Sequence, residues 1–251
     1  MSDVLLYPSD AGPDSVTKYI QAFSWGEVRS DQLPKEIRLN IRTLDDVPGY
    51  FDFADVYSFM AQSLKRGSKV VEVGSYFGKS VVYLALQSSL FSRDLDIYAV
   101  DTFGGEGELK DVTEKLAHIG YPLRKLYDNV LRMFGVEDKI TTLEMRSVEA
   151  ASLFEDGSLA FVFLDADHAY SSVVADIRAW LPKVSFGGIL AGHDFTFDDV
   201  GKAVSEELPG YERVSWCSWV YRKDGRDVES CMGYPASTDL GGFPSGDSFE
   251  T

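Results

Sequence analysis

Cysteine is scarce in this chain, and the arrangement of its few cysteines excludes two kinds of site. Cys217 and Cys231 are the only ones among 251 residues, and their spacing fits no metal-binding motif. Cys217 falls in a strand-like run and Cys231 in a polar stretch near the C-terminus, so no disulfide framework is expected. The chain also lacks a basic, apolar leader and any run of about 18 apolar residues, so we expect a cytoplasmic location and no membrane partner.

Positive charge is also in short supply. The chain has 24 Lys and Arg against 40 Asp and Glu, which gives a net charge of −16. Non-specific nucleic-acid binding needs a basic surface, so no nucleic-acid partner is expected. The hydrophobic fraction of 45% is enough for a full core, and the length fits one domain with extensions.

The most informative stretch is a strand, a glycine loop, a helix and a second strand that ends on an acid. Residues 70–80 read VVEVGSYFGKS, with Glu72, Gly74 and Gly78 in the loop region, and residues 97–101 read IYAVD, ending on Asp101. Glycines let a ligand lie against the backbone at a helix N-terminus, and an acid at the next strand end accepts hydrogen bonds from ribose hydroxyls. The simpler interpretation is that Gly74 and Gly78 only mark a tight turn.

Strand-like and helical runs alternate along the chain, which indicates an α/β fold with a parallel sheet covered by helices. The expected strands are 70–74, 97–101, 140–145, 160–165 and 188–193. The expected helices are 80–90, 123–134, 148–154, 170–183 and 198–208. Two β-rich runs, 211–215 and 216–222, follow the last helix.

On these motifs the chain resembles class I S-adenosylmethionine (SAM)-dependent methyltransferases. The string EVGSYFGKS at 72–80 is similar to the first motif of the catechol and caffeoyl-CoA O-methyltransferases, and closer still to bacterial sugar and macrolide O-methyltransferases. The resemblance implies a Rossmann-like fold with a mostly parallel seven-stranded sheet, helices on both faces and a C-terminal antiparallel hairpin. The methyltransferase domain would span 51–223, after an N-terminal extension or cap at 1–50 and before an acidic, flexible tail at 224–251.

The resemblance also implies a set of SAM-binding residues. Tyr76 and Ser80 match the loop beside the methionine end of SAM, and Ser147 matches the position at the adenine edge. Arg146 stands where the family commonly has an acid. Turn packing and helix capping are the structural alternatives for Tyr76 and Ser80. The expected cofactor-binding residues are Glu72, Gly74, Tyr76, Gly78, Ser80, Asp101 and Ser147.

A second constellation lies at two later strand ends. Residues 161–170 read FVFLDADHAY and place Asp165 and His168 after one strand, and residues 187–194 read GGILAGHD and place His193 and Asp194 after another. Parallel strands end at the same edge of a sheet, so Asp165, His193 and Asp194 are expected to converge. Carboxylates with an imidazole are suitable ligands for a divalent cation.

The resemblance assigns roles to these residues. Asp165 and Asp194 match metal ligands of the metal-dependent O-methyltransferases, whereas His193 departs from the carboxylate usual there, which leaves Mg²⁺ or Mn²⁺ as the expected metal. His168 matches a general base of the macrolide-modifying relatives, so His168 and Asp165 are the expected catalytic residues. The structural alternatives are that Asp165 or Asp167 caps the next helix, and that His193 and Asp194 form a hydrogen-bonded pair without metal.

These observations predict a SAM-dependent methyltransferase that, assisted by a divalent metal, methylates a hydroxyl of a small-molecule acceptor such as a sugar or natural product. The N-terminal part, with aromatic residues at 50, 51, 53 and 57, is expected to cover the site or to form a homodimer contact. One alternative is a nicotinamide-dependent oxidoreductase, although the loop departs from the GxGxxG pattern. The other is a non-catalytic scaffold or partner protein with the same fold.

Overall fold

The computed structural model describes residues 43–105, 109–118 and 120–224. Most of the predicted N-terminal extension and nearly all of the predicted acidic tail lie outside these residues. Among the helices of the described part, none has the length and apolar character needed to cross a bilayer.

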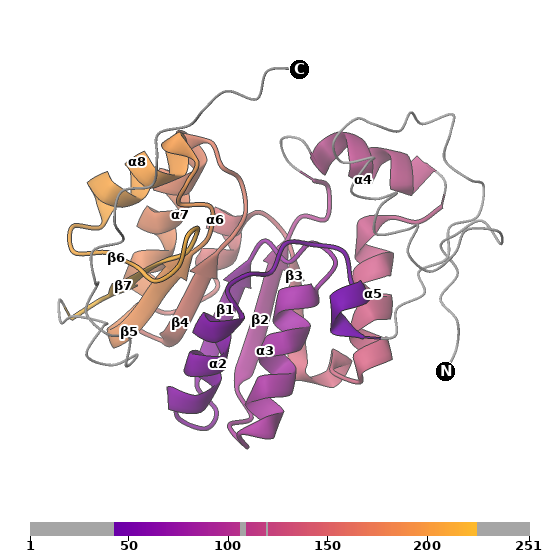
Figure 1. Ribbon diagram of the computed structural model, residues 1–251, viewed down its shortest axis with the longest axis horizontal. Coiled ribbons are helices and arrows are strands. Elements are labelled where there is room, and N and C mark those ends of the chain that lie inside the picture. The colour runs from indigo at the N-terminus through magenta and orange to yellow at the C-terminus, as the bar shows by residue number, and fades with distance from the viewer. Residues whose placement is uncertain (1–42, 106–108, 119, 225–251) are drawn as a thin grey trace.

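A seven-stranded sheet forms the centre of the molecule (Figure 1). Its order is β3-β2-β1-β4-β5-β7-β6. The neighbours from β3 to β5 are parallel, whereas β7 runs antiparallel to both β5 and β6. This confirms the expected Rossmann-like class I fold with its C-terminal antiparallel pair. The strands are β1 (Lys69–Val73), β2 (Asp96–Asp101), β3 (Ile140–Glu144), β4 (Leu159–Leu164), β5 (Val184–Gly192), β6 (Glu212–Arg213) and β7 (Trp219–Arg222).

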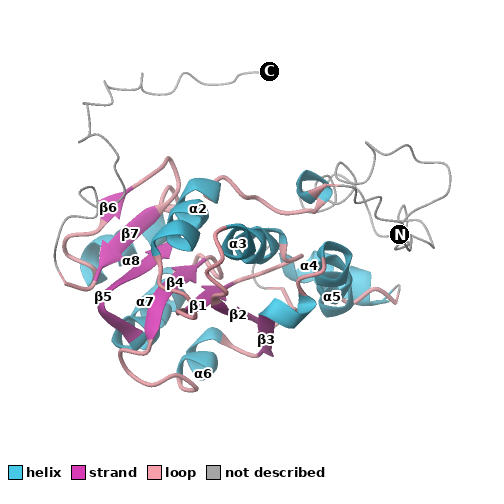
Figure 2. Cartoon of the chain, turned by 90° about the horizontal axis from the view of Figure 1, so that it is seen from below, coloured by secondary structure: helices cyan, strands magenta, loops and turns pink. Residues whose placement is uncertain are grey.

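Helices cover both faces of the sheet. Figure 2 shows α2, α3 and α5 on one face and α6, α7 and α8 on the other. The helices are α2 (Ala54–Ser63), α3 (Lys79–Leu90), α4 (Leu109–His118), α5 (Leu123–Phe134), α6 (Ser147–Ala151), α7 (Tyr170–Trp180) and α8 (Asp198–Glu207). Short 3₁₀ turns lie at Leu44–Asp46, Glu137–Lys139 and Leu181–Lys183.

The central strands are buried on both sides, which explains their continuous apolar sequence. Val70 belongs to the core cluster under α2 and α3, whereas its neighbour Val71 belongs to the cluster under α7 and α8. Helix α7 presents an apolar stripe to the sheet, on which Val173, Ile177 and Trp180 are buried. Side chains that alternate along a strand therefore supply two cores from one sheet.

Several elements differ from the sequence-based expectation, among them α7, which ends at Trp180 before the expected 183, and β7, which begins at Trp219 after the expected 216. Strand β5 begins at Val184, before the expected 188, and α6 ends at Ala151, before the expected 154. Helix α4 was not predicted, because it is short and lies between a glycine-rich segment and Pro122, where no long apolar stripe develops. Thr113 and Leu116 are its buried side chains among those described.

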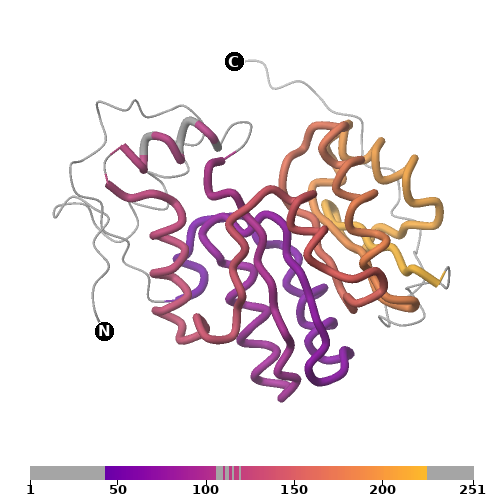
Figure 3. Tube along the Cα trace, turned by 180° about the vertical axis from the view of Figure 1, so that it is seen from behind, coloured from indigo at the N-terminus to yellow at the C-terminus, as the bar shows by residue number. Residues whose placement is uncertain are grey.

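Much of the aromatic cluster before β1 packs into or against the core. Phe53 and Tyr57 are buried and pack against Phe163 of β4, with ring centroids 4.4 and 5.1 Å away. Phe51 packs edge-on against Phe53 at 4.9 Å, whereas Tyr50 is 70% exposed. The cluster therefore fixes the segment before α2 to the sheet. In Figure 3 the later part of the chain, orange to yellow, gathers at one end of this sheet.

Candidate cofactor and metal site

The glycines of the loop after β1 are required by packing. A Cβ built at Gly74 would overlap the carbonyl oxygen of Asp165, and one at Gly78 would lie 3.0 Å from the ring of Tyr127. Both residues have a positive φ, of 88° and 85°, which favours glycine. The close approach of the residue after β4 and of α5 is therefore one physical reason for these glycines. Their contact with SAM stays a prediction.

Asp101 holds the glycine loop in place. Its Oδ2 accepts hydrogen bonds from the backbone N–H groups of Ser75 and Tyr76, both at 2.8 Å, and its Oδ1 accepts one from Phe103 at 2.7 Å. Tyr76 adopts a left-handed φ of 48° in this turn. Burial raises the pKa of Asp101, against the lowering effect of these three donors. The carboxylate keeps further lone pairs, so it remains able to accept ribose hydroxyls as predicted.

Glu72 is a buried acid at the base of this loop. The hydroxyl of Tyr57 donates to its Oε2 at 2.6 Å, whereas its Oε1 is buried without a hydrogen-bond partner. Burial raises the pKa of Glu72 to about 7, although the hydrogen bond from Tyr57 and the nearby hydroxyls of Ser75 and Ser80 lower it. An unsatisfied buried carboxylate oxygen is costly. The ammonium and sulfonium groups of SAM are cationic, so the residues of this loop fit that cofactor.

The serines assigned to SAM have partners within the protein. Ser147, the first residue of α6, accepts a hydrogen bond from the indole N–H of Trp180 at 2.9 Å and can still donate its own proton. Ser80 is buried near the start of α3, where its hydroxyl helps to lower the pKa of Glu72. Ser147 therefore keeps a donor for an adenine edge, whereas Ser80 supports the loop from within.

Sheet hydrogen bonds bring the loop and the second constellation to one edge. The N–H of Gly74 donates to Val100, that of Asp165 to Val73, and that of His193 to Leu164, at 2.8, 2.8 and 3.1 Å. These bonds continue the parallel ladders past the last residues of β1, β4 and β5. The expected convergence at the carboxyl ends of the strands is thus present.

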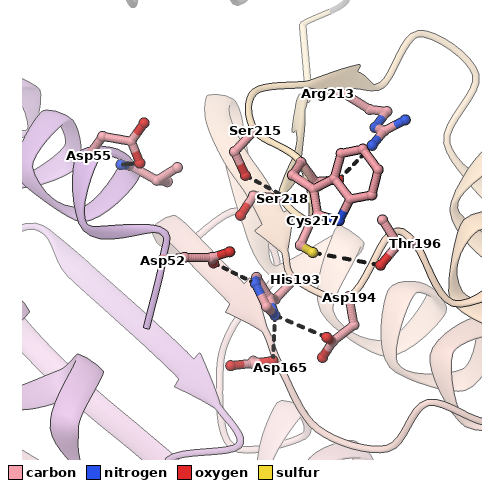
Figure 4. Close-up of polar contacts among 12 residues, drawn as sticks. Asp52, Asp55, Asp165, His193, Asp194, Thr196, Arg213, Ser215, Cys217 and Ser218 are labelled. Carbon is pink, nitrogen blue, oxygen red and sulfur yellow. Dashed lines mark hydrogen bonds and ion pairs between the residues drawn. The ribbon is translucent and has the colours of Figure 1, made fainter. Parts of the chain in front are cut away.

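Asp165, His193 and Asp194 lie together in Figure 4. The His193 Nδ1 atom is 3.1 Å from Asp194 Oδ1 and 3.7 Å from Asp165 Oδ1. One ligand atom from each residue lies within 4.8 Å of the others, so the three could hold one cation. Asp165 does not cap α7, since Ala169 is the N-cap residue of that helix. Asp167 instead shapes the turn by accepting hydrogen bonds from the N–H of Ala169 and the hydroxyl of Ser172.

The three groups have strongly shifted ionisation. Burial raises the pKa of Asp165 to about 8, with His193 opposing and Asp194 adding to the shift. Burial alone would lower the pKa of His193, but the hydrogen bond to Asp194 and the charges of Asp165 and Asp194 raise it to about 9. The pKa of Asp194 is low despite its burial, because both His168 and His193 bond it. Clustered, shifted groups of this kind are typical of functional sites.

His168 is tied to the same cluster. Its Nε2 lies 2.9 Å from Asp194 Oδ2, and its ring stacks on Phe197 with centroids 4.8 Å apart. Its pKa is raised chiefly by the hydrogen bond to Asp194. Because Nε2 is held by Asp194, Nδ1 is the nitrogen on which His168 would accept a proton. His118, in contrast, is exposed on α4.

Sequence analysis missed two residues of this cluster, Asp52 and Cys217. Asp52 Oδ1 lies 2.7 Å from His193 Nε2, and the neighbouring Phe53 ring packs 5.1 Å from the imidazole. Cys217 Sγ comes close enough for Asp52, His193 and Cys217 to form a second candidate metal group within 4.8 Å. No local pattern marks either residue, because Asp52 lies in an irregular segment and Cys217 between the last two strands.

Comparisons with known proteins agree with this geometry. Residues 71–195 match the family described as methyltransferase domain. The O-methyltransferase NovP superposes with a TM-score of 0.53 at 14% identity, over 84% of this chain and 99% of that chain. A SAM-dependent O-methyltransferase from Thermotoga maritima superposes with a TM-score of 0.50 at 14% identity, over 74% of this chain and 73% of that chain. At such identities these structures show the shared fold.

The name of a curated relative does not state an activity. The uncharacterized protein y4gI of Sinorhizobium fredii is 27% identical over 179 residues, which are 70% of this chain. The matched region spans only 17% of that relative's length. The family match covers the glycine loop, Asp101 and both strand-end clusters up to Asp194, and this confirms the methyltransferase interpretation over the nicotinamide-dependent one. This chain is a class I SAM-dependent methyltransferase that resembles the O-methyltransferases.

Proposed function

We propose that this protein transfers the methyl group of SAM to a hydroxyl oxygen of a small molecule, with the help of a divalent cation. The observation that carries the proposal is the cluster of Asp165, His193 and Asp194 directly beside the glycine loop. Gly74 touches the backbone of Asp165, so the cofactor loop and the cluster are neighbours. An acceptor held at the cluster would lie next to a methyl group carried by the loop.

The donor set supports a hard or borderline cation. Two carboxylates and one imidazole are ligands that Mg²⁺ and Mn²⁺ accept, with Mn²⁺ favoured by the nitrogen. His193 would use Nδ1, since Nε2 is held by Asp52 at 2.7 Å. A cation bound there would lower the pKa of the acceptor hydroxyl and orient it.

The protein groups around the cluster have distinct tasks. His168 would take the hydroxyl proton on Nδ1, and Asp194 would hold its ring through Nε2. Phe197 stacks on His168 and is 51% exposed, and Trp216 beside Cys217 is 64% exposed. Exposed aromatic faces at the cluster suit the ring of a sugar or of a phenolic natural product. The net charge of −16 supports a small-molecule acceptor over a nucleic acid.

A methyl-transfer assay with EDTA tests the proposal. Purified protein, SAM and panels of sugar and phenol acceptors would be followed by mass spectrometry, with EDTA and then excess Mg²⁺ or Mn²⁺. We expect methylated product that disappears in EDTA and returns with the cation. Asp165→Asn and Asp194→Asn should each abolish this rescue but keep SAM binding.

Asp167→Asn is the matched control, because Asp167 lies in the same loop but outside the candidate metal group, and its carboxylate accepts hydrogen bonds from Ala169 and Ser172. Full activity in EDTA would remove the cation from the proposal. SAM binding without transfer to any acceptor would favour the scaffold alternative.

A further inference from the structure

The two ring nitrogens of His193 face different sets of ligands. Nδ1 faces Asp165 and Asp194, whereas Nε2 faces Asp52 and the side of the molecule where Cys217 lies (Figure 4). Asp52, His193 and Cys217 each offer a ligand atom within 4.8 Å of the others. The second set therefore differs from the first in chemistry, because it replaces a carboxylate by a thiol.

Three separate parts of the fold hold these ligands in place. Asp52 is fixed by the next residue, Phe53, which is buried between Phe163 and the His193 ring. The carbonyl of Cys217 accepts a hydrogen bond from the N–H of Phe195 at 2.9 Å, which ties the turn before β7 to the loop after β5. Packing and backbone hydrogen bonds thus bring the three ligands together, and cation binding would need no large movement of the chain.

The side chains retain freedom to bind. The Asp52 side chain is 56% exposed, so its carboxylate can turn from the hydrogen bond with His193 to a cation. The Cys217 thiol contacts Thr196 Oγ1 at 3.6 Å, a weak interaction, and it forms no disulfide. One thiolate, one imidazole and one carboxylate are ligands that Zn²⁺ prefers, and three protein ligands leave a fourth position open.

We infer that Asp52, His193 Nε2 and Cys217 form a second cation site, selective for Zn²⁺ and similar thiophilic ions, and that it competes with the acidic site for His193. A neutral imidazole has one lone pair and one N–H on its nitrogens. A cation on Nε2 leaves the N–H on Nδ1, where it donates to Asp194 at 3.1 Å. His193 is then lost as a ligand of the acidic site, so the two cations exclude each other.

Cobalt spectroscopy tests the new site without any assay of activity. A Cys231→Ser background leaves Cys217 as the single thiol, since the chain has two cysteines. Reduced protein titrated with Co²⁺ should develop thiolate-to-cobalt charge-transfer absorption at one ion per chain, and Zn²⁺ should displace it. Cys217→Ser should abolish the band, and Asp52→Ala should weaken Co²⁺ binding at least about tenfold.

Two matched variants serve as controls. Asp55→Ala alters a carboxylate three residues from Asp52 that lies apart from His193 in Figure 4 and accepts a hydrogen bond from the N–H of Val56, and it should leave the band unchanged. Asp165→Asn should also keep the band, because Asp165 belongs to the other set. Absence of the band in the background protein, or its persistence in Asp52→Ala at full affinity, would overturn the site.

A competition experiment tests whether the two cations exclude each other. Mn²⁺ binding, followed by the loss of the free Mn²⁺ electron paramagnetic resonance signal, should weaken at least about tenfold once Zn²⁺ is bound. In Cys217→Ser, Zn²⁺ should lose this effect at the same concentration. Equal Mn²⁺ affinity with and without Zn²⁺ would contradict the shared use of His193, even where the cobalt band is present. These readouts are separate from methyl transfer, so they can fail while the proposed function stands.

Discussion

His168 joins an acid and an exposed aromatic ring, and its contacts define how it could act. The Nε2 atom of His168 bonds Asp194, and this hydrogen bond raises the pKa of His168 above the ordinary value for histidine. The neutral imidazole therefore dominates only at a higher pH than for an ordinary histidine. A general base must be neutral, and activity that depends on His168 should therefore rise with pH through this raised value.

We expect His168→Ala to lower the turnover number by about 10²- to 10⁴-fold, and the deficit to shrink at high pH, where hydroxide can remove the proton. His118→Ala is the control, since His118 is exposed on α4. Turnover numbers measured from pH 6 to 10 provide the readout. A deficit that stays constant over this range would assign His168 to positioning of Asp194.

Asp101 has a structural task as well as its predicted contact with ribose. Charge-assisted hydrogen bonds connect it to the N–H groups of the glycine loop. Asp101→Ala should weaken SAM binding by about 1.5–3 kcal/mol, because both the ribose acceptor and the support of the loop are lost. Isothermal titration calorimetry measures this, with Asp96→Ala at the other end of β2 as the control. Unchanged SAM affinity would contradict the assignment.

The loop between β1 and α3 is shaped by its neighbours. A methyl group at Gly74 would collide with the backbone of Asp165, whereas one at Gly67 would meet nothing within 4 Å. Both residues have a positive φ, of 88° and 73°, so both substitutions carry similar backbone strain.

The two glycines thus offer a paired test. Gly67→Ala should cost about 1 kcal/mol of unfolding free energy, and Gly74→Ala should cost at least about 1–3 kcal/mol more, since overpacking adds to the strain. Urea denaturation of the two variants gives the comparison. Equal losses would show that β4 moves aside, and the close approach would then not explain the glycine.

Elements with a periodic pattern could be predicted from sequence. Helix α5 has the predicted bounds, because its buried stripe is regular and Gly135 ends it in a left-handed conformation. Asp165, His193 and Asp194 could also be predicted to meet, since parallel strands end at one edge. Asp52 could not, because its place depends on how Phe53 packs against Phe163. Long-range packing of this kind leaves no local signal.

The ionisation of the cluster affects the stability of the whole molecule. The folded protein raises the pKa of Glu72 to about 7, of Asp165 to about 8 and of His193 to about 9. Glu72 and Asp165 keep their protons in the folded state over a pH range in which they lose them in the unfolded state. The free energy of unfolding therefore falls as the pH rises from the ordinary pKa of each acid through its raised pKa. The contribution of His193 to the free energy of unfolding is fully present below about pH 6.5 and is lost as the pH rises to about 9.

The raised pKa values of Glu72, Asp165 and His193 all act to lower the stability of the folded protein as the pH rises from 6 to 9. In EDTA, we expect the melting temperature to fall over this range by roughly 5 °C or more. Differential scanning calorimetry at fixed ionic strength measures it. His193→Gln should flatten the slope, whereas His118→Ala should leave it unchanged. A melting temperature that increases with pH would be incompatible with these shifts.

The hydrogen bond between Asp52 and His193 joins residues 141 positions apart. A ribosome adds about 5–20 residues per second, so Asp52 emerges roughly 7–28 s before its partner. Cys217 is synthesised later still, after all the parallel strands. The glycine loop and Asp101 are therefore synthesised long before His193 and Cys217 exist, and the half of the site that we propose to bind metal is the last to be completed during synthesis.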